Sequence, residues 1–203
     1  PAGFTCRRPG SPRFNHAMER KNILRGEKVQ LTALQPDDAP HIAEWYQDAS
    51  FLRAYDSSPA YPKTEKQLAA MIEEEQKRKD GFIFAVRLLD SRRIIGILQL
   101  DGIAWTHGTS FISIGIGEEA DRGQGYGREA IQLGLRFAFD ELNLHRVCLT
   151  VFSYNEAART LYERLGFQRE GVYREHLMRD GQRHDMLLYG LLRREWQELQ
   201  QNK

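Results

Sequence analysis

Residues 118–128 read EEADRGQGYGR, between a segment that alternates like a strand and a segment with helical spacing. Gly123, Gly125 and Gly127 allow the backbone to turn, and they let its N–H groups approach a ligand without a Cβ atom in the way. At the start of a helix such N–H groups are unpaired, and the helix dipole favours an anion there. Arg122 can add charge-assisted hydrogen bonds to phosphate oxygens. The stretch is therefore predicted to hold a phosphate group, although a plain glycine-rich turn before a helix has the same pattern.

Two common phosphate-binding loops are excluded by direct inspection. The P-loop pattern GxxxxGK[ST] does not occur in the chain. A dinucleotide fingerprint GxGxxG that began at Gly123 would need glycine at position 128, where Arg128 stands. It would also belong to an early βαβ unit, whereas this loop follows a late strand in a run of consecutive strands. The loop is thus not predicted to bind ATP or NAD.

The patterns on either side of the loop predict one α/β domain. Apolar alternation predicts a first strand at 29–34. Apolar runs between turn residues predict strands at 82–89, 93–105, 110–117 and 145–151, and a last hairpin of 167–178 with 183–192 around Arg179-Asp180-Gly181. Helical spacing predicts helices from 37, from a capping box of Thr64 and Gln67, over 125–141 and over 155–165. Less regular patterns predict a structured loop at 51–63 and, at 191–199, either an extended strand or a short helix with Trp196 exposed. The order βααβββαβαββ favours a single mixed sheet.

The composition is that of a globular chain with a core of its own. The chain has 203 residues, is 41% hydrophobic, lacks a run of 18 apolar residues, and carries 29 basic and 28 acidic side chains. These values exclude wholesale disorder, a transmembrane helix and the basic excess of a dedicated nucleic-acid binder. Two cysteines form no disulfide framework and suit a reducing cytoplasm.

The charge is unevenly distributed along the chain. Residues 1–30 have a net charge of +5 and the remainder −4, so the body suits a cationic substrate. Residues 1–22 show no periodicity and no apolar core of a secretory signal, and we expect them to be a disordered segment or an extension. The folded domain is expected at 23–203.

Two motifs together resemble a known family. Arg122-x-x-Gly125-x-Gly127 resembles the R/Q-x-x-G-x-G/A acetyl-CoA loop of the GNAT N-acetyltransferases, and residues 155–167 (NEAARTLYERLGF) resemble the N-x-x-A-x-x-L-Y-E-x-L-G-F segment of that family. Glu170-Gly171 and Arg174 continue a pattern of its ribosomal-protein and spermidine acetyltransferase branches. The resemblance implies a single GNAT-like domain: a mixed, mostly antiparallel central sheet flanked by helices, in which two central parallel strands splay apart.

The resemblance also implies how acetyl-CoA, the expected co-substrate, is held. The backbone from Gly123 through Gln124, Gly125 and Tyr126 to Gly127 would bind its pyrophosphate. The strand segment Ile114-Gly115-Ile116 would lie beside the pantetheine arm. Asn155 would contact the pantetheine, and it is equally a good helix N-cap. No metal is expected, because the six histidines show no metal-ligand spacing.

The catalytic residues are expected among a tyrosine and several acidic groups. Tyr162 is the candidate general acid, since a phenol can give a proton to the departing thiolate; without the resemblance it would be a core residue. Glu118, with Glu119 beside it, is the candidate base near the loop, although an acidic turn in solvent has the same pattern. Tyr55 and Asp56 are the alternatives.

The resemblance implies direct acetyl transfer from acetyl-CoA to a primary amine. The acceptor is expected to be the α-amino group of a protein or peptide, and a polyamine such as spermidine, or another small amine, is the alternative. A non-catalytic acyl-CoA sensor is an alternative of another class. The protein is expected to be cytoplasmic, with no nucleic-acid or membrane partner, and a homodimer is left open.

Overall fold

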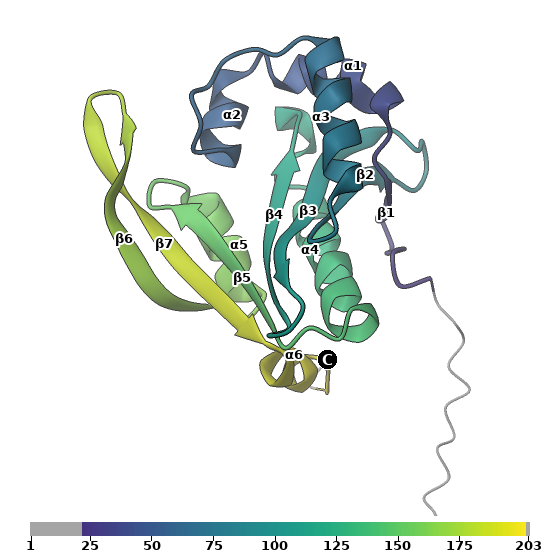
Figure 1. Cartoon of the computed structure of the whole chain (residues 1–203), viewed down its shortest axis with the longest axis vertical. Helices are drawn as coiled ribbons and strands as arrows, with labels where there is room; N and C mark the ends of the chain where they lie inside the picture. The colour runs from purple at the N-terminus through teal and green to yellow at the C-terminus, as the bar shows by residue number, and fades with distance from the viewer. Residues whose placement is uncertain (1–21, 202–203) are drawn as a thin grey trace, which may run out of the picture.

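The computed structural model describes residues 22–201, and these form a seven-stranded sheet with helices on both faces (Figure 1). Except for Asn22, the predicted terminal segment 1–22 lies outside the described residues. In spatial order the strands are β1 (Val29–Ala33), β2 (Phe82–Leu88), β3 (Ile94–Ala104), β4 (Thr109–Ile116), β5 (Arg146–Phe152), β7 (Gln182–Leu192) and β6 (Gln168–Arg179). The helices are α1 (Ala39–Trp45), α2 (Ala49–Tyr55), α3 (Glu65–Lys77), α4 (Tyr126–Arg136), α5 (Glu156–Arg164) and α6 (Arg193–Gln201).

The two central strands are parallel and separate after a short paired stretch. All other neighbouring strands are antiparallel. β4 and β5 pair only from Thr109 with Arg146 to Phe111 with Cys148. Beyond this point β4 stays paired with β3 and β5 stays paired with β7, so the two strands diverge (Figure 1). We call the region between their diverging edges the opening. The predicted mixed sheet with splayed central strands is thus confirmed.

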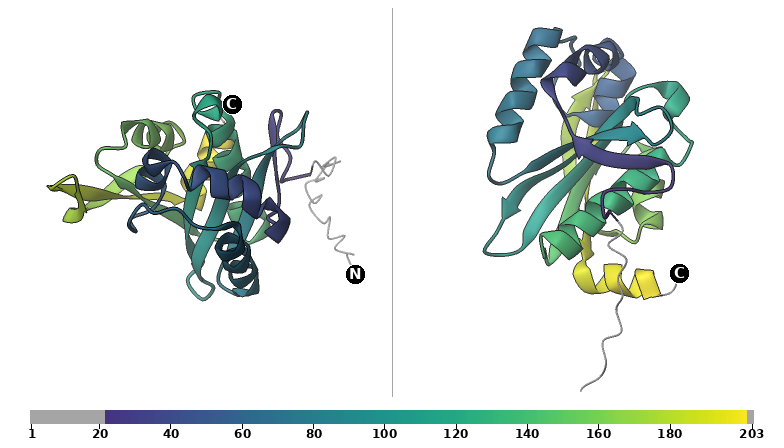
Figure 2. Two further views of the ribbon diagram at one scale, coloured as in Figure 1. Left: turned by 90° about the horizontal axis from the view of Figure 1, so that it is seen from above. Right: turned by 90° about the vertical axis from the view of Figure 1, so that its right-hand side faces the viewer.

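Each face of the sheet has its own core, because side chains alternate along the strands. Phe84 and Val86 of β2 pack in the core that includes α4 and α5, whereas Ala85 between them packs in the core with α1, α2 and α3. Figure 2 shows α3 and α4 on opposite sides of the sheet. The loop before α4 and the aromatic side chains of α1 and α2 therefore approach β4 from opposite faces.

The local sequence correctly predicted the start of α3, the turn between β6 and β7, and the helix α4. Thr64 and Gln67 form the expected capping box at the start of α3. Asp180 and Gly181 turn between β6 and β7 with φ of 50° and 74°, as an Asp-Gly hairpin turn requires. The helix predicted over 125–141 is α4, continued by a π-helical turn at Phe137–Glu141.

Two expectations were wrong. The predicted loop at 51–63 begins as helix, because α2 runs from Ala49 to Tyr55 and the Asp48 carboxylate accepts a hydrogen bond from the Ser50 N–H at 2.8 Å. Trp196 is buried, with 5% of its surface exposed, and its ring stacks on Phe139 at 6.0 Å between centroids. The C-terminal stretch folds as the short helix α6, whose apolar face needs a partner in the core.

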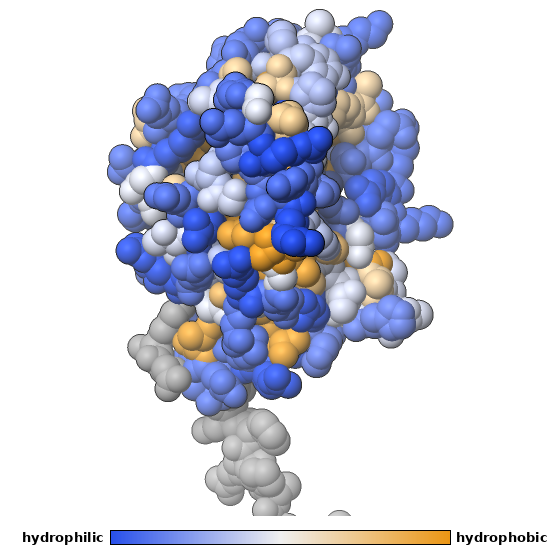
Figure 3. All heavy atoms as spheres, turned by 90° about the vertical axis from the view of Figure 1, so that its left-hand side faces the viewer, coloured by the Kyte–Doolittle hydropathy of each residue, from blue (hydrophilic) through white to orange (hydrophobic). Residues whose placement is uncertain are grey.

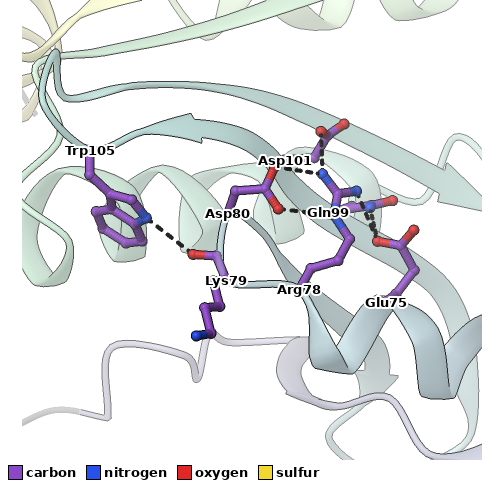
Figure 4. A network of polar contacts seen from close by, with 7 residues as sticks. All are labelled: Glu75, Arg78, Lys79, Asp80, Gln99, Asp101 and Trp105. Carbon is purple, nitrogen blue, oxygen red and sulfur yellow. Dashed lines mark hydrogen bonds and ion pairs between the residues drawn. The ribbon is translucent and has the colours of Figure 1, made fainter.

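A polar network anchors the connection from α3 to β2 (Figure 4). The Arg78 guanidinium donates to the carboxylates of Glu75, Asp80 and Asp101 at 3.0–3.4 Å. Gln99 of β3 also donates to Glu75, at 2.8 Å. One arginine therefore ties the end of α3 to β3, and the helix is held against the sheet on the α2 side.

The face on the β6–β7 side is mostly polar, with a small apolar group at its centre and others toward its lower end (Figure 3). Small apolar areas are ordinary on monomeric proteins and need no partner. Among residues 22–201, no helix is long and apolar enough to cross a membrane.

Candidate active site

The loop between β4 and α4 has a backbone conformation that favours glycine. Gly123 and Gly125 have φ of 75° and 85°, and Gly125 is the N-cap of α4. A Cβ atom at Gly123 would meet nothing within 4 Å, and one at Gly125 would meet only the Lys28 ammonium, at 3.9 Å. Gly123, Gln124 and Gly125 are exposed. The backbone N–H groups thus border open space at a helix N-terminus, which fits an anionic ligand.

Arg122 points away from that open space. Its guanidinium donates hydrogen bonds to the carbonyl oxygens of Ile116 at 3.2 Å and Gly117 at 2.6 Å. It also lies 3.6 Å from the Asp48 carboxylate, just before α2. Here Arg122 fixes the loop to the end of β4, so its side chain positions the loop rather than facing the exposed glycines.

The glycines at the end of β4 make room for aromatic rings. A Cβ atom at Gly115 would lie 2.7 Å from the Tyr55 ring and 3.1 Å from Phe51, and one at Gly117 would overlap the Trp45 ring. Both glycines therefore allow a close approach to β4, by side chains of α1 and α2.

The opposite face of β4 packs against the helices that border the opening. Ile114 and Ile116 are half-buried in the core with α4. Tyr126 and Gly127, in the first turn of α4, are also half-buried. A Cβ atom at Gly127 would touch Ile116 at 3.6 Å, and Ile114 and Leu161 at 4.0 Å. The first turn of α4 therefore lies directly between β4 and α5.

Tyr162 lies on α5 and is buried, with 6% of its surface exposed. Its ring packs edge-on against Phe167 at 5.9 Å. Burial raises the pKa of Tyr162 to about 12, and no charge or hydrogen bond contributes to the shift. The hydroxyl thus keeps its proton at neutral pH, as a proton donor must. Its packing in the core and its candidate role as acid are compatible.

Asn155 stands where β5 ends and α5 begins. Its side-chain oxygen accepts a hydrogen bond from the Ala158 N–H at 3.1 Å, so it is the N-cap of α5. The side chain is half-buried, and its NH₂ group is a separate donor that the cap does not use. Capping therefore leaves this residue able to bind a ligand.

Glu118 is held on the far side of β4 from the opening. Its carboxylate lies 3.4 Å from Arg93, which immediately precedes β3, and β3 and β5 flank β4 on opposite sides. Arg93 also makes a two-pronged ion pair with buried Asp121, at 2.8 Å for each contact. Glu119 is exposed in the turn that follows β4. These pairs anchor the loop and draw Glu118 toward β3.

Similarity to known proteins shows the family to which the chain belongs. The model of the acetyltransferase (GNAT) domain matches residues 28–168. The chain belongs to the GNAT acetyltransferase family. It is similar to the SPbeta prophage-derived uncharacterized N-acetyltransferase YokL of Bacillus subtilis, at 31% identity over 85% of this chain and 94% of that protein.

Two further relatives span nearly the whole domain. The ribosomal protein uS5-alanine N-acetyltransferase of Escherichia coli is 26% identical over 85% of this chain and 92% of its own length. Spermidine N-acetyltransferase from Vibrio cholerae, solved in complex with CoA and spermine, superposes with a TM-score of 0.76 at 25% identity, over 83% of this chain and 98% of that one.

As a GNAT enzyme, the chain is an acyltransferase that uses acetyl-CoA as its co-substrate. The open glycine loop at the start of α4 suits the pyrophosphate, and beyond Phe111 and Cys148 the facing edges of β4 and β5 no longer pair with each other. Among residues 22–201, no three side chains are grouped so as to hold a metal ion.

The GNAT domain also has a bridge across the opening that the sequence did not reveal. At the tip of the β6–β7 hairpin, Arg179 donates to the carbonyl oxygens of residues 56–58 at 3.0–3.2 Å. Arg53 of α2 pairs with Asp180 at 2.5 Å, and the Tyr154 hydroxyl donates to the Arg53 carbonyl at 2.5 Å. Because α2 packs on β4 while β7 pairs with β5, these contacts join the two halves of the sheet.

The two alternative bases lie beside this bridge. The Asp56 carboxylate accepts from the Ser58 N–H at 3.0 Å. Tyr55 stacks on Phe51 at 5.3 Å, and burial, with smaller contributions from Tyr46 and Asp56, raises its pKa above the usual range. A neutral phenol that holds its proton this firmly is a poor base at pH 7.

Proposed function

We propose that this enzyme transfers the acetyl group of acetyl-CoA to the α-amino group of a protein or peptide, in the cytoplasm. The amine nitrogen attacks the thioester carbonyl, the C–S bond breaks, and the sulfur takes a proton. Tyr162 supplies that proton or a hydrogen bond in its place, because its buried hydroxyl stays protonated. The amine loses its own proton to a base or to water. Asn155 and the loop from Gly123 to Gly127 hold the donor.

The observation that supports an α-amino acceptor is the pairing of Glu118 with Arg93. A carboxylate drawn toward β3 is badly placed to take a proton from an amine at the opening. Without a well-placed base, an amine that is already partly deprotonated at pH 7 should react faster. At pH 7 about one in ten α-amino groups is neutral, against about one in 2,500 amines with a pKa of 10.4. The similarity to the uS5-alanine acetyltransferase agrees with this choice.

The test is acetyl-CoA-dependent thiol release with a panel of amines. Short peptides that begin with Ser, Ala or Thr are compared with spermidine, spermine, aminoglycosides and free amino acids. The matched control is each peptide with its N-terminus blocked and a lysine retained. We expect turnover with free N-termini and none with blocked ones. Equal turnover of blocked peptides would contradict the proposal.

The pH dependence separates the two acceptor classes without further variants. For an α-amino acceptor, kcat/KM should rise with pH and level off near the amine pKa of about 8. For a polyamine it should continue to rise toward about pH 10. The similarity to spermidine acetyltransferase makes the polyamine the second candidate. Turnover of spermidine alone would establish that candidate.

A further inference from the structure

Lys28 lies beside the glycine loop, although it is about a hundred residues away in the sequence. It precedes β1, and its side chain is exposed. Its ammonium donates to the Gln124 carbonyl at 3.2 Å and lies 3.9 Å from where a Cβ atom of Gly125 would be. A positive charge is thus held at the edge of the open space that the loop N–H groups border.

The placement of Lys28 is fixed by a carboxylate from the same helix. Glu129, in the first turn of α4, accepts backbone hydrogen bonds from Lys28 at 3.0 Å and Val29 at 3.2 Å, and from Glu27 as well. Gly26 leaves room for this contact, because a Cβ atom there would overlap the Glu129 carboxylate in its present position. Three N–H donors converge on one side chain, so the start of β1 is clamped to the start of α4.

We propose that Lys28 binds the pyrophosphate of acetyl-CoA, as a cationic side chain outside the glycine motif, and that Glu129 is its positioning residue. This inference rests on the proposed use of the loop. The loop supplies backbone N–H donors, while its own arginine, Arg122, is directed toward β4. Lys28 adds a positive charge beside these donors, and the Gln124 carbonyl takes one of the three hydrogens of its ammonium.

Binding measurements with ligands that do and do not carry phosphates test this role. We expect Lys28→Met to weaken CoA binding about tenfold, as the loss of one charge-assisted contact would, and Lys28→Arg to retain most of the affinity. Pantetheine, which has no phosphate, should bind the Lys28→Met variant and the unsubstituted chain equally. The Lys28→Met substitution should lower the affinity for dephospho-CoA as much as the affinity for CoA, because dephospho-CoA retains the pyrophosphate. Lys66→Met, an exposed lysine on α3, is the matched control.

Glu129 is tested by its dependence on Lys28. Glu129→Ala should weaken CoA but not pantetheine binding, Glu129→Gln should restore much of the loss, and Glu129→Ala combined with Lys28→Met should be no weaker than Lys28→Met alone. Unchanged CoA affinity in Lys28→Met, or an equal loss for pantetheine, would overturn the proposal. Failure of the unsubstituted chain to bind CoA would instead overturn the proposed function, and Lys28 with it.

Discussion

At the scale of single residues, Tyr162 is buried in the core and is also the proton donor of the mechanism we propose. With a pKa of about 12, its phenol is a weaker acid than a free thiol of pKa about 8.5. Complete proton transfer to a solvated thiolate would therefore be uphill. Burial also disfavours a thiolate, however, so a hydrogen bond from Tyr162 gains value as the sulfur leaves. In the proposed mechanism the hydroxyl therefore acts as a hydrogen-bond donor in the transition state.

Removal of the Tyr162 hydroxyl should therefore slow acetyl transfer. Tyr162→Phe should lower kcat by about 100-fold, the usual size of a general-acid contribution, and leave the Kd for CoA within about twofold. Tyr189→Phe is the matched control, because Tyr189 is also buried and its hydroxyl donates to Glu163 at 2.7 Å. That variant should be somewhat less stable but turn over normally. Steady-state kinetics and calorimetry make the comparison, and an undiminished kcat in Tyr162→Phe would remove Tyr162 from the mechanism.

Sequence patterns located residues better than they located side-chain directions. Gly123 and Gly125 could be predicted because a positive φ leaves a strong preference for glycine. Asn155 could be predicted as a cap because capping depends on neighbours in the chain. Arg122 and Glu118 could not be oriented, because their partners lie on β4 and beside β3 and leave no local pattern.

At the scale of elements, the bridge from α2 to the β6–β7 hairpin closes one side of the opening. Arg179 makes most of the contacts in this bridge, since its guanidinium donates hydrogen bonds to three carbonyl groups of the chain after α2. The same chain segment contains Asp56, next to the aromatic rings that cover Gly115. These contacts do not involve the glycine loop, and in the proposed function the amine acceptor would bind on this side of β4.

Arg179→Ala should consequently affect one substrate only. We expect KM for the amine acceptor to rise at least about fivefold, from the loss of charge-assisted hydrogen bonds, while KM for acetyl-CoA stays unchanged. Arg183→Ala is the control, because Arg183 lies on the same hairpin and donates within it, to the Glu175 carbonyl. Initial rates with each substrate varied in turn would show the difference. Parallel changes in both KM values would mean that the bridge supports the whole site.

At the scale of the whole molecule, the order of elements followed from periodicity, and their contacts across the sheet did not. β2 and β3 are recognisable as apolar runs because both of their faces are buried, whereas β4 alternates between buried and more exposed residues. α2 was missed because its seven residues are too few to show a clear helical period, and the expected loop at 51–63 also contains Pro59 and Pro62. Trp196 was misjudged because α6 has only one buried residue to mark its inner face.

Four tyrosines with raised pKa values predict how the stability of the whole fold depends on pH. Burial is the main cause of the raised pKa values of Tyr46, Tyr55, Tyr162 and Tyr189. A folded-state pKa above the unfolded value of about 10 means that the unfolded chain releases these protons first. This contribution to stability is complete below about pH 10 and is lost as the pH rises through the folded pKa values. Acid conditions leave it untouched, because these phenols are protonated in both states.

The free energy of unfolding, measured by urea denaturation at constant ionic strength, should therefore fall with increasing steepness above about pH 10. Each tyrosine contributes a slope of at most about 1.4 kcal/mol per pH unit between its unfolded and folded pKa values. For Tyr162 that interval runs from about 10 to about 12. Tyr162→Phe should remove this one contribution, so the variant should lose stability less steeply over that interval than the unsubstituted chain. Identical slopes would show that water reaches the hydroxyl of Tyr162 in the folded state. Tyr162 would then not be a proton donor protected from solvent.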